Sequence, residues 1–434
     1  MKYYYSEKNL RKINKEFKLI ILKNVKTIKI DDILKENDIF QKFNKNNESF
    51  HKKTEKYEKN EIKIQKKSGK NIKQKVKDIN YNNNNNIKEK IKLNKNIKKK
   101  KNNQYIENKI KDFQLLIEIT KDSYSDYTLD NTFVVFTSID DIIYVIYTNK
   151  NKSIISYNII ENIRINEIKN AHTTDITNFR HFLDKINKRD ILISISLCDN
   201  NLKLWDIGNY ECICNLQNIN KSGQLFSSCL FNDNDKICII TSCANGNNES
   251  IKVFDTNYNK IKEIKDSIDN TYFIDVYYDK KSSKNFIITG NNGYIKSYDY
   301  NENIVYHIYN DNDKKRHCSI IIDNKEDIIK MIESSFDGNI RIWDFHSAIL
   351  LNKIKVSENG WLFGICLWDN EHLFVACGDK TIKIINIKKN LILSKLNEFK
   401  NKVLSIQKLK HPHFGECFIS QGYEKEQIKM FINK

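Results

Sequence analysis

The sequence has few residues of the kinds that interrupt or cross-link a chain. Its 434 residues include one proline, Pro412, and 12 glycines, and none of the ten cysteines precedes Cys198. The cysteines form no CxxC pair and no group with zinc-ligand spacing, so we interpret them as reduced thiols. No apolar run approaches the roughly 18 residues that span a membrane, and the first residues lack a secretory apolar core. These absences predict an intracellular protein, cytoplasmic or nuclear, that is not secreted and has no transmembrane segment.

Charge is distributed unevenly along the chain. Residues 1–110 contain 32 Lys and Arg against 13 Asp and Glu, whereas residues 111–434 contain 41 against 42, so the net charge of +18 comes from the N-terminal part. That part includes the runs Asn82 to Asn86 and Lys98 to Lys101. Such polar sequence buries too little apolar surface to offset the loss of chain entropy. Residues 1–110 are therefore predicted to be a basic, low-complexity and largely disordered tail.

One short segment of this tail has helical periodicity. Ser6 suits the N-cap of a helix, and Glu7 is favourable in its first turn. Within residues 6–25 the apolar positions recur three or four apart, which predicts an amphipathic helix with one apolar stripe. The stripe is a candidate docking surface for a partner and consists of Leu10, Ile13, Phe17, Ile20 and Ile21.

The rest of the chain repeats. Seven segments each read as one apolar strand that ends in an aromatic residue and often an acid, and their starts are 48, 49, 44, 45, 42 and 46 residues apart. A period of this size is typical of a four-stranded propeller blade. The seven segments are SIISYN (Ser153 to Asn158), NLKLWD (Asn201 to Asp206), SIKVFD (Ser250 to Asp255), YIKSYD (Tyr294 to Asp299), NIRIWD (Asn339 to Asp344), TIKIIN (Thr381 to Asn386) and QIKMFI (Gln427 to Ile432).

The turns and the chain ends indicate how the repeats are assembled. Steps such as Asp337-Gly338 lie between apolar runs and suit tight hairpin turns, because these residues tolerate positive φ. The last repeat stops after its third strand, and a spare apolar strand, residues 114–120, precedes the first repeat. If that strand completes the last blade, the ring closes and its sheet edges are covered. Residues 111–434 are therefore predicted to form an all-β, seven-bladed propeller closed by strand 114–120.

Some repeats resemble WD-repeat propeller proteins. The strands NLKLWD and NIRIWD each follow a turn aspartate, and Ala171-His172 stands where that family usually has Gly-His. The resemblance implies a hydrogen-bonded structural tetrad of a turn Asp, a Ser or Thr, a His and a Trp. Phe254, Tyr298 and Phe431 depart from the pattern by replacing Trp. The residues that the resemblance assigns to such networks are His172, Asp199, Trp205, Asp337, Trp343 and Asp379.

Motifs for chemistry are missing from the sequence. It contains no Walker loop, GxSxG elbow, HExxH motif or Gly-rich dinucleotide turn, so we expect no enzyme, no cofactor and no metal site. Trp361 and Trp368 flank one predicted strand, and Tyr272 lies at the start of another. Most such aromatics are expected to pack blades together, while those at strand ends on the ring face could anchor a peptide.

These features favour a non-enzymatic interaction scaffold. The propeller face would bind a peptide or protein, and the N-terminal helix would dock a second partner. The helix Ser6 to Leu22 before a WD-type ring is similar to the autophagy scaffold that brings a ubiquitin-like conjugation complex to membranes, which is one alternative. Another is a nuclear RNA-processing or ribosome-assembly factor of the WD-repeat type. The Lys-rich tail could contact RNA phosphates or anionic lipid weakly.

Overall fold

The described part of the chain belongs to its second unit. The computed structural model describes residues 113–119, 133–149, 151–196, 198, 200–219, 224–244, 251–264, 270–358, 360–423 and 427–433. The chain divides into residues 1–99 and 100–434, and each described residue belongs to the latter. The predicted tail, with its stripe of Leu10, Ile13, Phe17, Ile20 and Ile21, lies outside the described residues.

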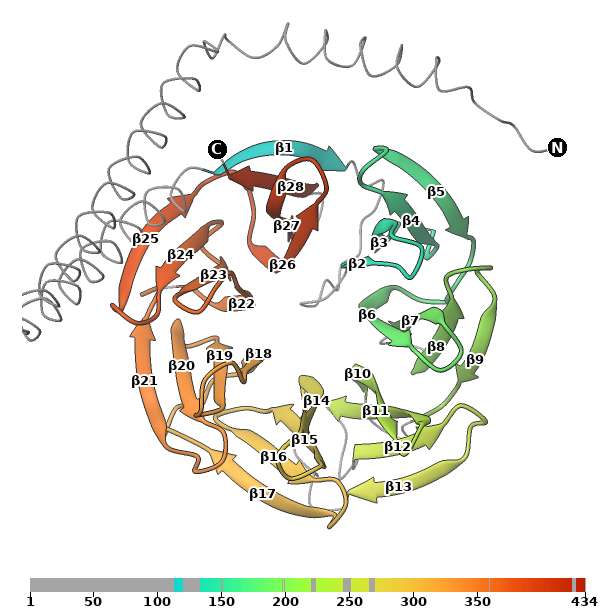
Figure 1. Ribbon diagram of the computed structural model, residues 1–434, viewed down its shortest axis with the longest axis horizontal. Helices are drawn as coiled ribbons and strands as arrows, with labels where there is room; N and C mark the ends of the chain where they lie inside the picture. The colour runs from blue at the N-terminus through green and yellow to red at the C-terminus, as the bar shows by residue number, and fades with distance from the viewer. Residues whose placement is uncertain are drawn as a thin grey trace, which may run out of the picture. The chain divides into compact units, whose positions relative to one another are not determined.

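Seven four-stranded antiparallel sheets surround a central axis (Figure 1). The prediction of an all-β, seven-bladed propeller is confirmed. The first blade holds β2 (Phe133–Thr137), β3 (Ile143–Thr148), β4 (Ile154–Asn158) and β5 (Ile163–Ile168). The second holds β6 (Ile176–Asp184), β7 (Arg189–Ser196), β8 (Asn201–Asp206) and β9 (Cys212–Leu216). The third holds β10 (Gln224–Asp233), β11 (Lys236–Ala244), β12 (Ile251–Asp255) and β13 (Lys260–Ile264).

The remaining blades follow the same order from the axis outward. The fourth holds β14 (Phe273–Asp279), β15 (Lys284–Gly290), β16 (Ile295–Asp299) and β17 (Ile304–Tyr309). The fifth holds β18 (His317–Asp323), β19 (Lys330–Ser335), β20 (Asn339–Asp344) and β21 (Leu350–Lys355). The sixth holds β22 (Leu362–Leu367), β23 (His372–Cys377), β24 (Ile382–Asn386) and β25 (Leu391–Leu396). The seventh holds β26 (Val403–His411), β27 (Gly415–Gly422), β28 (Ile428–Asn433) and β1 (Phe113–Ile119).

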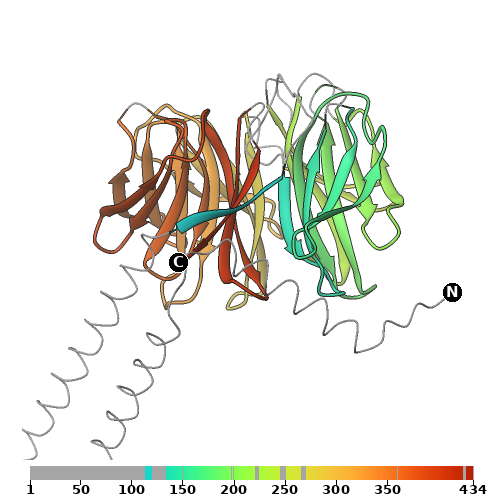
Figure 2. The same ribbon diagram turned by 90° about the horizontal axis from the view of Figure 1, so that it is seen from above.

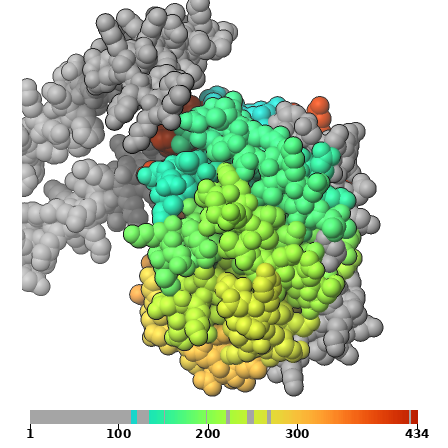
Figure 3. Space-filling model, turned by 90° about the vertical axis from the view of Figure 1, so that its right-hand side faces the viewer, coloured from blue at the N-terminus to red at the C-terminus, as the bar shows by residue number. Residues whose placement is uncertain are grey.

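Strand composition follows the position of each strand in its blade. The second strands are largely buried on both faces because each blade is packed between two neighbours; β23 (HLFVAC) is buried along its whole length. The fourth strands lie at the circumference and keep part of their surface in water, as β25 (LILSKL) does. Successive blades follow one another along the outer surface of the ring (Figure 3). The apolar cores therefore lie between adjacent blades.

A β-bulge recurs where the third strand pairs with the fourth. In each of the first six blades the register shifts at the aromatic position of the repeat, or at its counterpart Ile385 in the sixth. An extra residue at a bulge increases the local twist of the strand. The repeated position therefore marks a point of increased twist between the third and fourth strands of the blade. The positions are Tyr157, Trp205, Phe254, Tyr298, Trp343 and Ile385.

The Asp337-Gly338 turn joins β19 and β20 and requires glycine. Gly338 has φ of +82°, in the left-handed region. A Cβ atom there would lie 2.1 Å from the carbonyl oxygen of Ser357. Any other residue would therefore displace the chain that enters the sixth blade.

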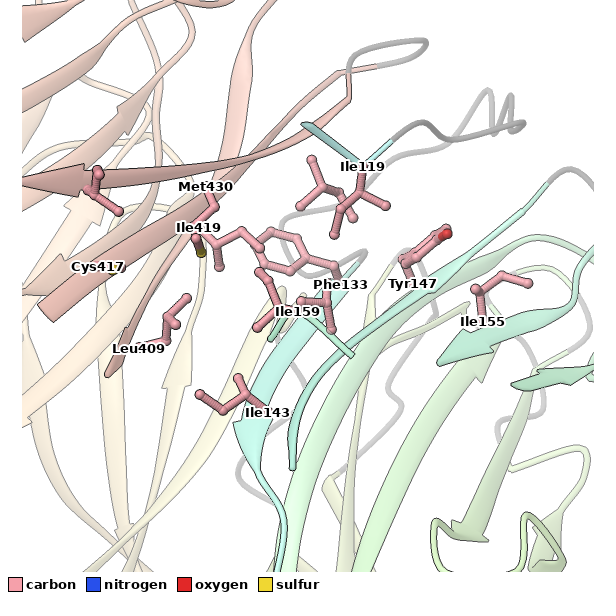
Figure 4. Close-up of a cluster of buried hydrophobic side chains, with 13 residues drawn as sticks. Ile119, Phe133, Ile143, Tyr147, Ile155, Ile159, Leu409, Cys417, Ile419 and Met430 are labelled. Carbon is pink, nitrogen blue, oxygen red and sulfur yellow. The ribbon is translucent and has the colours of Figure 1, made fainter. Parts of the chain in front are cut away.

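The ring closes where the two ends of the propeller meet. β1, the strand predicted over residues 114–120, pairs antiparallel with β28, so that Phe113 lies opposite Asn433 and Ile119 opposite Ile428. It forms the outer edge of the seventh blade (Figures 1 and 2). A cluster of buried side chains from β1, β26–β28 and the first blade fills the junction, with Ile119, Phe133 and Met430 among them (Figure 4). Segments far apart in sequence thus share one core.

Candidate functional site

In the second blade, one serine joins two residues of the predicted tetrad. His172 Nε2 lies 2.7 Å from Ser194 Oγ, and Trp205 Nε1 donates to the same oxygen at 2.8 Å. All three side chains are buried. Each hydrogen bond therefore avoids an unpaired buried polar group, which would cost about 1–3 kcal/mol. Asp199, the turn acid of this network, lies outside the described residues.

The fifth blade uses a glutamate where the second blade uses a serine. Trp343 Nε1 donates to Glu333 Oε1 at 3.1 Å, and His317 Nδ1 bonds to Glu333 Oε2. His317 Nε2 lies 3.4 Å from Asp313 Oδ2. Burial by itself would lower the pKa of His317, but the charge of Glu333 and the hydrogen bond to Asp313 raise it to about 9. The imidazolium therefore stays charged at neutral pH and compensates the buried carboxylate.

This pKa predicts a pH dependence of stability. Because the folded pKa of His317 exceeds the unfolded value near 6.5, the ion pair contributes fully below about pH 6.5 and is lost as the pH rises through about 9. The wild type should therefore be more stable than H317Q at low pH. This difference in the free energy of unfolding should fall by up to about 3 kcal/mol as the pH rises from about 6.5 to about 9. Urea unfolding at several pH values measures this difference. A difference that stays constant with pH would contradict the prediction. H413Q, which replaces an exposed histidine, is the control.

Arg341 lies beneath the same blade end and is fully buried. Its guanidinium forms ion pairs with Asp311, at 2.8 Å from Nε, and with Asp313, at 2.6 Å, and it donates to Asp337. Burial would raise the pKa of Asp311, but Arg341 and Lys353 together lower it to about 2. A planar fork of donors suits several carboxylates at once. Arg341 therefore holds the β17–β18 loop and the β19–β20 turn together.

A basic residue occupies the same position in six blades, third in each repeated segment from the second to the seventh. Four of these lysines donate to a backbone carbonyl in the loop that leads into the first strand of their own blade, at 2.6–2.9 Å. The residues are Lys203, Lys252, Lys296, Arg341, Lys383 and Lys429. In the sixth blade the predicted Asp379 also pairs with Lys383, at 2.7 Å. The four lysines and Arg341 therefore tie the loops of one face to the blades.

That face carries a row of stacked aromatic and cationic side chains. First strands begin and second strands end at the same face, because the strands of each sheet are antiparallel. At these strand ends seven side chains follow one another from the third blade to the seventh. We call them the aromatic belt: Phe226, Tyr272, Arg316, Phe336, Trp361, Lys402 and Tyr423.

The belt is held by alternating ring and cation contacts. The guanidinium carbon of Arg316 lies 4.6 Å from the ring centroid of Tyr272 and 5.3 Å from that of Phe336. The rings of Phe336 and Trp361 stack with centroids 4.8 Å apart and planes 8° apart. Lys402 Nζ lies 4.4 Å from the Trp361 centroid. Cation–π contacts of this kind contribute about 0.5–2 kcal/mol each. Trp361 is nevertheless 45% exposed, so the belt presents an aromatic edge to solvent.

A cavity of about 330 Å³ lies along the axis of the ring. First strands from six of the blades line it. Arg180 reaches it from β6 and contacts Asp275 at 3.4 Å and the carbonyl oxygen of Ile274 at 3.3 Å. Gln407 on β26 accepts from Val135 N at 2.9 Å and donates to Phe133 O at 3.1 Å. The side chain of Gln407 thus links the seventh blade to the first along the wall of the cavity.

Charges on the belt face are mixed. In its loops from the fifth to the seventh blade, the described residues include six acids and six bases. The acids are Asp311, Asp313, Asp337, Glu358, Asp379 and Glu398. The bases are Lys314, Lys315, Arg316, Lys380, Lys400 and Lys402. A surface of this kind has local cationic points but no continuous basic stripe.

The structure separates the two tryptophans that flank the predicted strand of the sixth blade. Trp368 is buried and stacks on Phe374 with centroids 4.9 Å apart, so it packs within the core. Trp361 belongs to the belt. Sequence analysis also noted Tyr272 as a strand-end aromatic, but it missed the other five members of the belt. Within the described ranges, no group of three or more His, Cys, Asp and Glu side chains could hold a metal ion.

No protein-family model matches the sequence, and no curated protein is similar to it. The seven-bladed ring is consistent with a WD-repeat-type fold. In the part of the chain that the structure covers, no helix is long and apolar enough to cross a membrane.

Proposed function

We propose that this protein is a non-enzymatic interaction scaffold of the WD-repeat type whose belt face binds a peptide or a protein. The observation that carries the proposal is Trp361, held by Phe336 and Lys402 at the ring face while 45% exposed. Tryptophan, tyrosine and arginine dominate the binding energy of many interfaces, and the belt contains all three. A rigid frame beneath them reduces the entropy lost on binding.

The second half of the proposal concerns the N-terminal part. The apolar stripe predicted over residues 6–25 would dock a second partner, which the intact chain would bring close to the first. The autophagy and nuclear RNA hypotheses both depend on residues 1–110, outside the described residues, and they stay predictions. The belt face, in contrast, can be tested directly.

Substituting Trp361 with alanine should remove a set of partners from the intact protein. The expected result of proximity labelling in cells is the loss of proteins that the wild type labels, because the exposed anchor of the belt is gone. Y278A is the matched control: Tyr278 is 51% exposed, and it lies near the end of the first strand β14, at the opposite face. If W361A and Y278A label the same proteins as the wild type, the belt face is not the interaction surface.

A further inference from the structure

Three members of the belt have polar groups that only donate hydrogen bonds, beside the hydroxyl groups of Tyr272 and Tyr423. Arginine, lysine and the indole of tryptophan can donate but cannot accept. The belt places one of each, Arg316, Trp361 and Lys402, in consecutive blades from the fifth to the seventh. Within the described residues, Trp361 Nε1 makes no hydrogen bond. A ligand that supplies acceptors would therefore suit these three side chains.

The stacking also limits which parts of the Trp361 and Phe336 rings can face a ligand. Phe336 covers one face of Trp361, Lys402 lies over that ring as well, and Arg316 lies over Tyr272 and Phe336. With the faces covered, the ring edges remain for contact, and the edge is the positive part of an aromatic quadrupole. Ring edges, guanidinium and ammonium all favour an anionic group.

The anion must be localised rather than extended. Carboxylates alternate with the cations on these loops, and Asp311, Asp313 and Asp337 gather around Arg341 directly below. A nucleic acid, with one phosphate charge after another, would meet these carboxylates as well as the cations. A single carboxylate on a peptide would meet only the donors, and its apolar neighbours could cover the exposed indole.

We infer that the aromatic belt binds a peptide segment that presents an Asp or Glu side chain next to an apolar residue. Arg316 and Lys402 donate to the carboxylate, and Trp361 packs against the apolar neighbour. Charge-assisted hydrogen bonds of this type are about twice as strong as neutral ones. The inference rests on the proposed function, since it names the ligand chemistry of the same face.

The test uses the full chain and a display library of random dodecapeptides. Peptides selected on the wild type and rejected by W361A should share an Asp or Glu at a fixed position. A fluorescein-labelled copy of a selected peptide should bind about tenfold more weakly when that residue is Gln, or when the protein carries R316A or K402A. K400A removes the same charge from the same loop and should leave binding unchanged. Thermal unfolding of each variant confirms that the ring is intact.

Three outcomes would overturn the inference. One is a library that gives no peptide whose binding depends on Trp361, and another is a set of selected peptides without a shared acid. The third is a 20-nucleotide poly(U) RNA whose binding is weakened by R316A and W361A. If any of these is found while W361A still loses partners in proximity labelling, the scaffold function stands and only the carboxylate ligand is wrong.

Discussion

Replacing Arg341 with methionine is expected to lower the free energy of unfolding by about 3–5 kcal/mol, because it removes the buried cation that three mostly buried carboxylates share. The arginine is fully buried, and Asp311, Asp313 and Asp337 all pair with it. Two of these acids come from the loop before β18, and the third comes from the turn after β19. Urea unfolding, followed by tryptophan fluorescence, measures the loss.

The repeat itself supplies the controls for this experiment. K203M changes the equivalent residue of the second blade, which donates to the single carbonyl oxygen of Ala171 at 2.7 Å, and should cost about 1 kcal/mol. R341K installs the residue that five other blades carry at this position. Its loss of stability should lie between those of R341M and K203M, because an ammonium cannot span three carboxylates. Adding D337N to R341M should recover part of the loss, since Asp337 is the acid of this cluster for which Arg341 provides the described ion pair. An effect of R341M no larger than that of K203M would show that the cluster is not stabilising.

The architecture was predictable because every blade buries its third strand in the same way and so repeats the same sequence pattern. The segments NLKLWD and NIRIWD coincide with β8 and β20, and the repeated aromatic position coincides with a bulge. A buried third strand needs alternating apolar residues and a tight turn before it, so its pattern survives in each blade. The period therefore predicted both the number of blades and the place of each third strand.

The blade networks could be predicted only in part. His172 and Trp205 meet through Ser194, but the sequence does not show that Glu333 takes the serine's place in the fifth blade. A carboxylate there needs a cation, and the structure supplies His317. Asp337, which the WD-repeat resemblance assigns to such a network, pairs with Arg341. Each departure follows from charge compensation among residues that are distant in sequence.

The belt could not be predicted from any single repeat. Trp361 and Trp368 lie at opposite ends of one strand, and nothing local distinguishes the exposed residue from the buried one. The difference comes from neighbours: Phe336 and Lys402 reach Trp361 from the fifth and seventh blades, whereas Trp368 packs against Phe113 and Phe374. One signal was available in the sequence: a basic residue is the third residue of six repeated segments. It marks the face of the ring at which the loops are anchored.

Substituting Phe113 with alanine should destabilise the ring by about 3–5 kcal/mol, the usual cost of removing a buried phenylalanine. Phe113 begins β1 and inserts its ring between the sixth and seventh blades. Its centroid lies 5.0–5.4 Å from those of Trp368, Phe374 and Phe418, in edge-on geometry. Closure depends on this strand, because β1 is the described strand that covers the outer edge of β28. The measurement is urea or thermal unfolding of the full chain.

The control lies on the same strand. Leu116 is 36% exposed on β1, so L116A removes apolar volume without opening the core and should cost no more than about 0.5 kcal/mol. Deleting residues 113–119 should destabilise the ring more than F113A does. The deletion also exposes the backbone groups of β28 to solvent and removes Ile119 from the junction with the first blade. If F113A and the deletion both unfold like L116A, the pairing of β1 with β28 does not hold the propeller shut. The seven sheets would then owe their stability to contacts between consecutive blades alone.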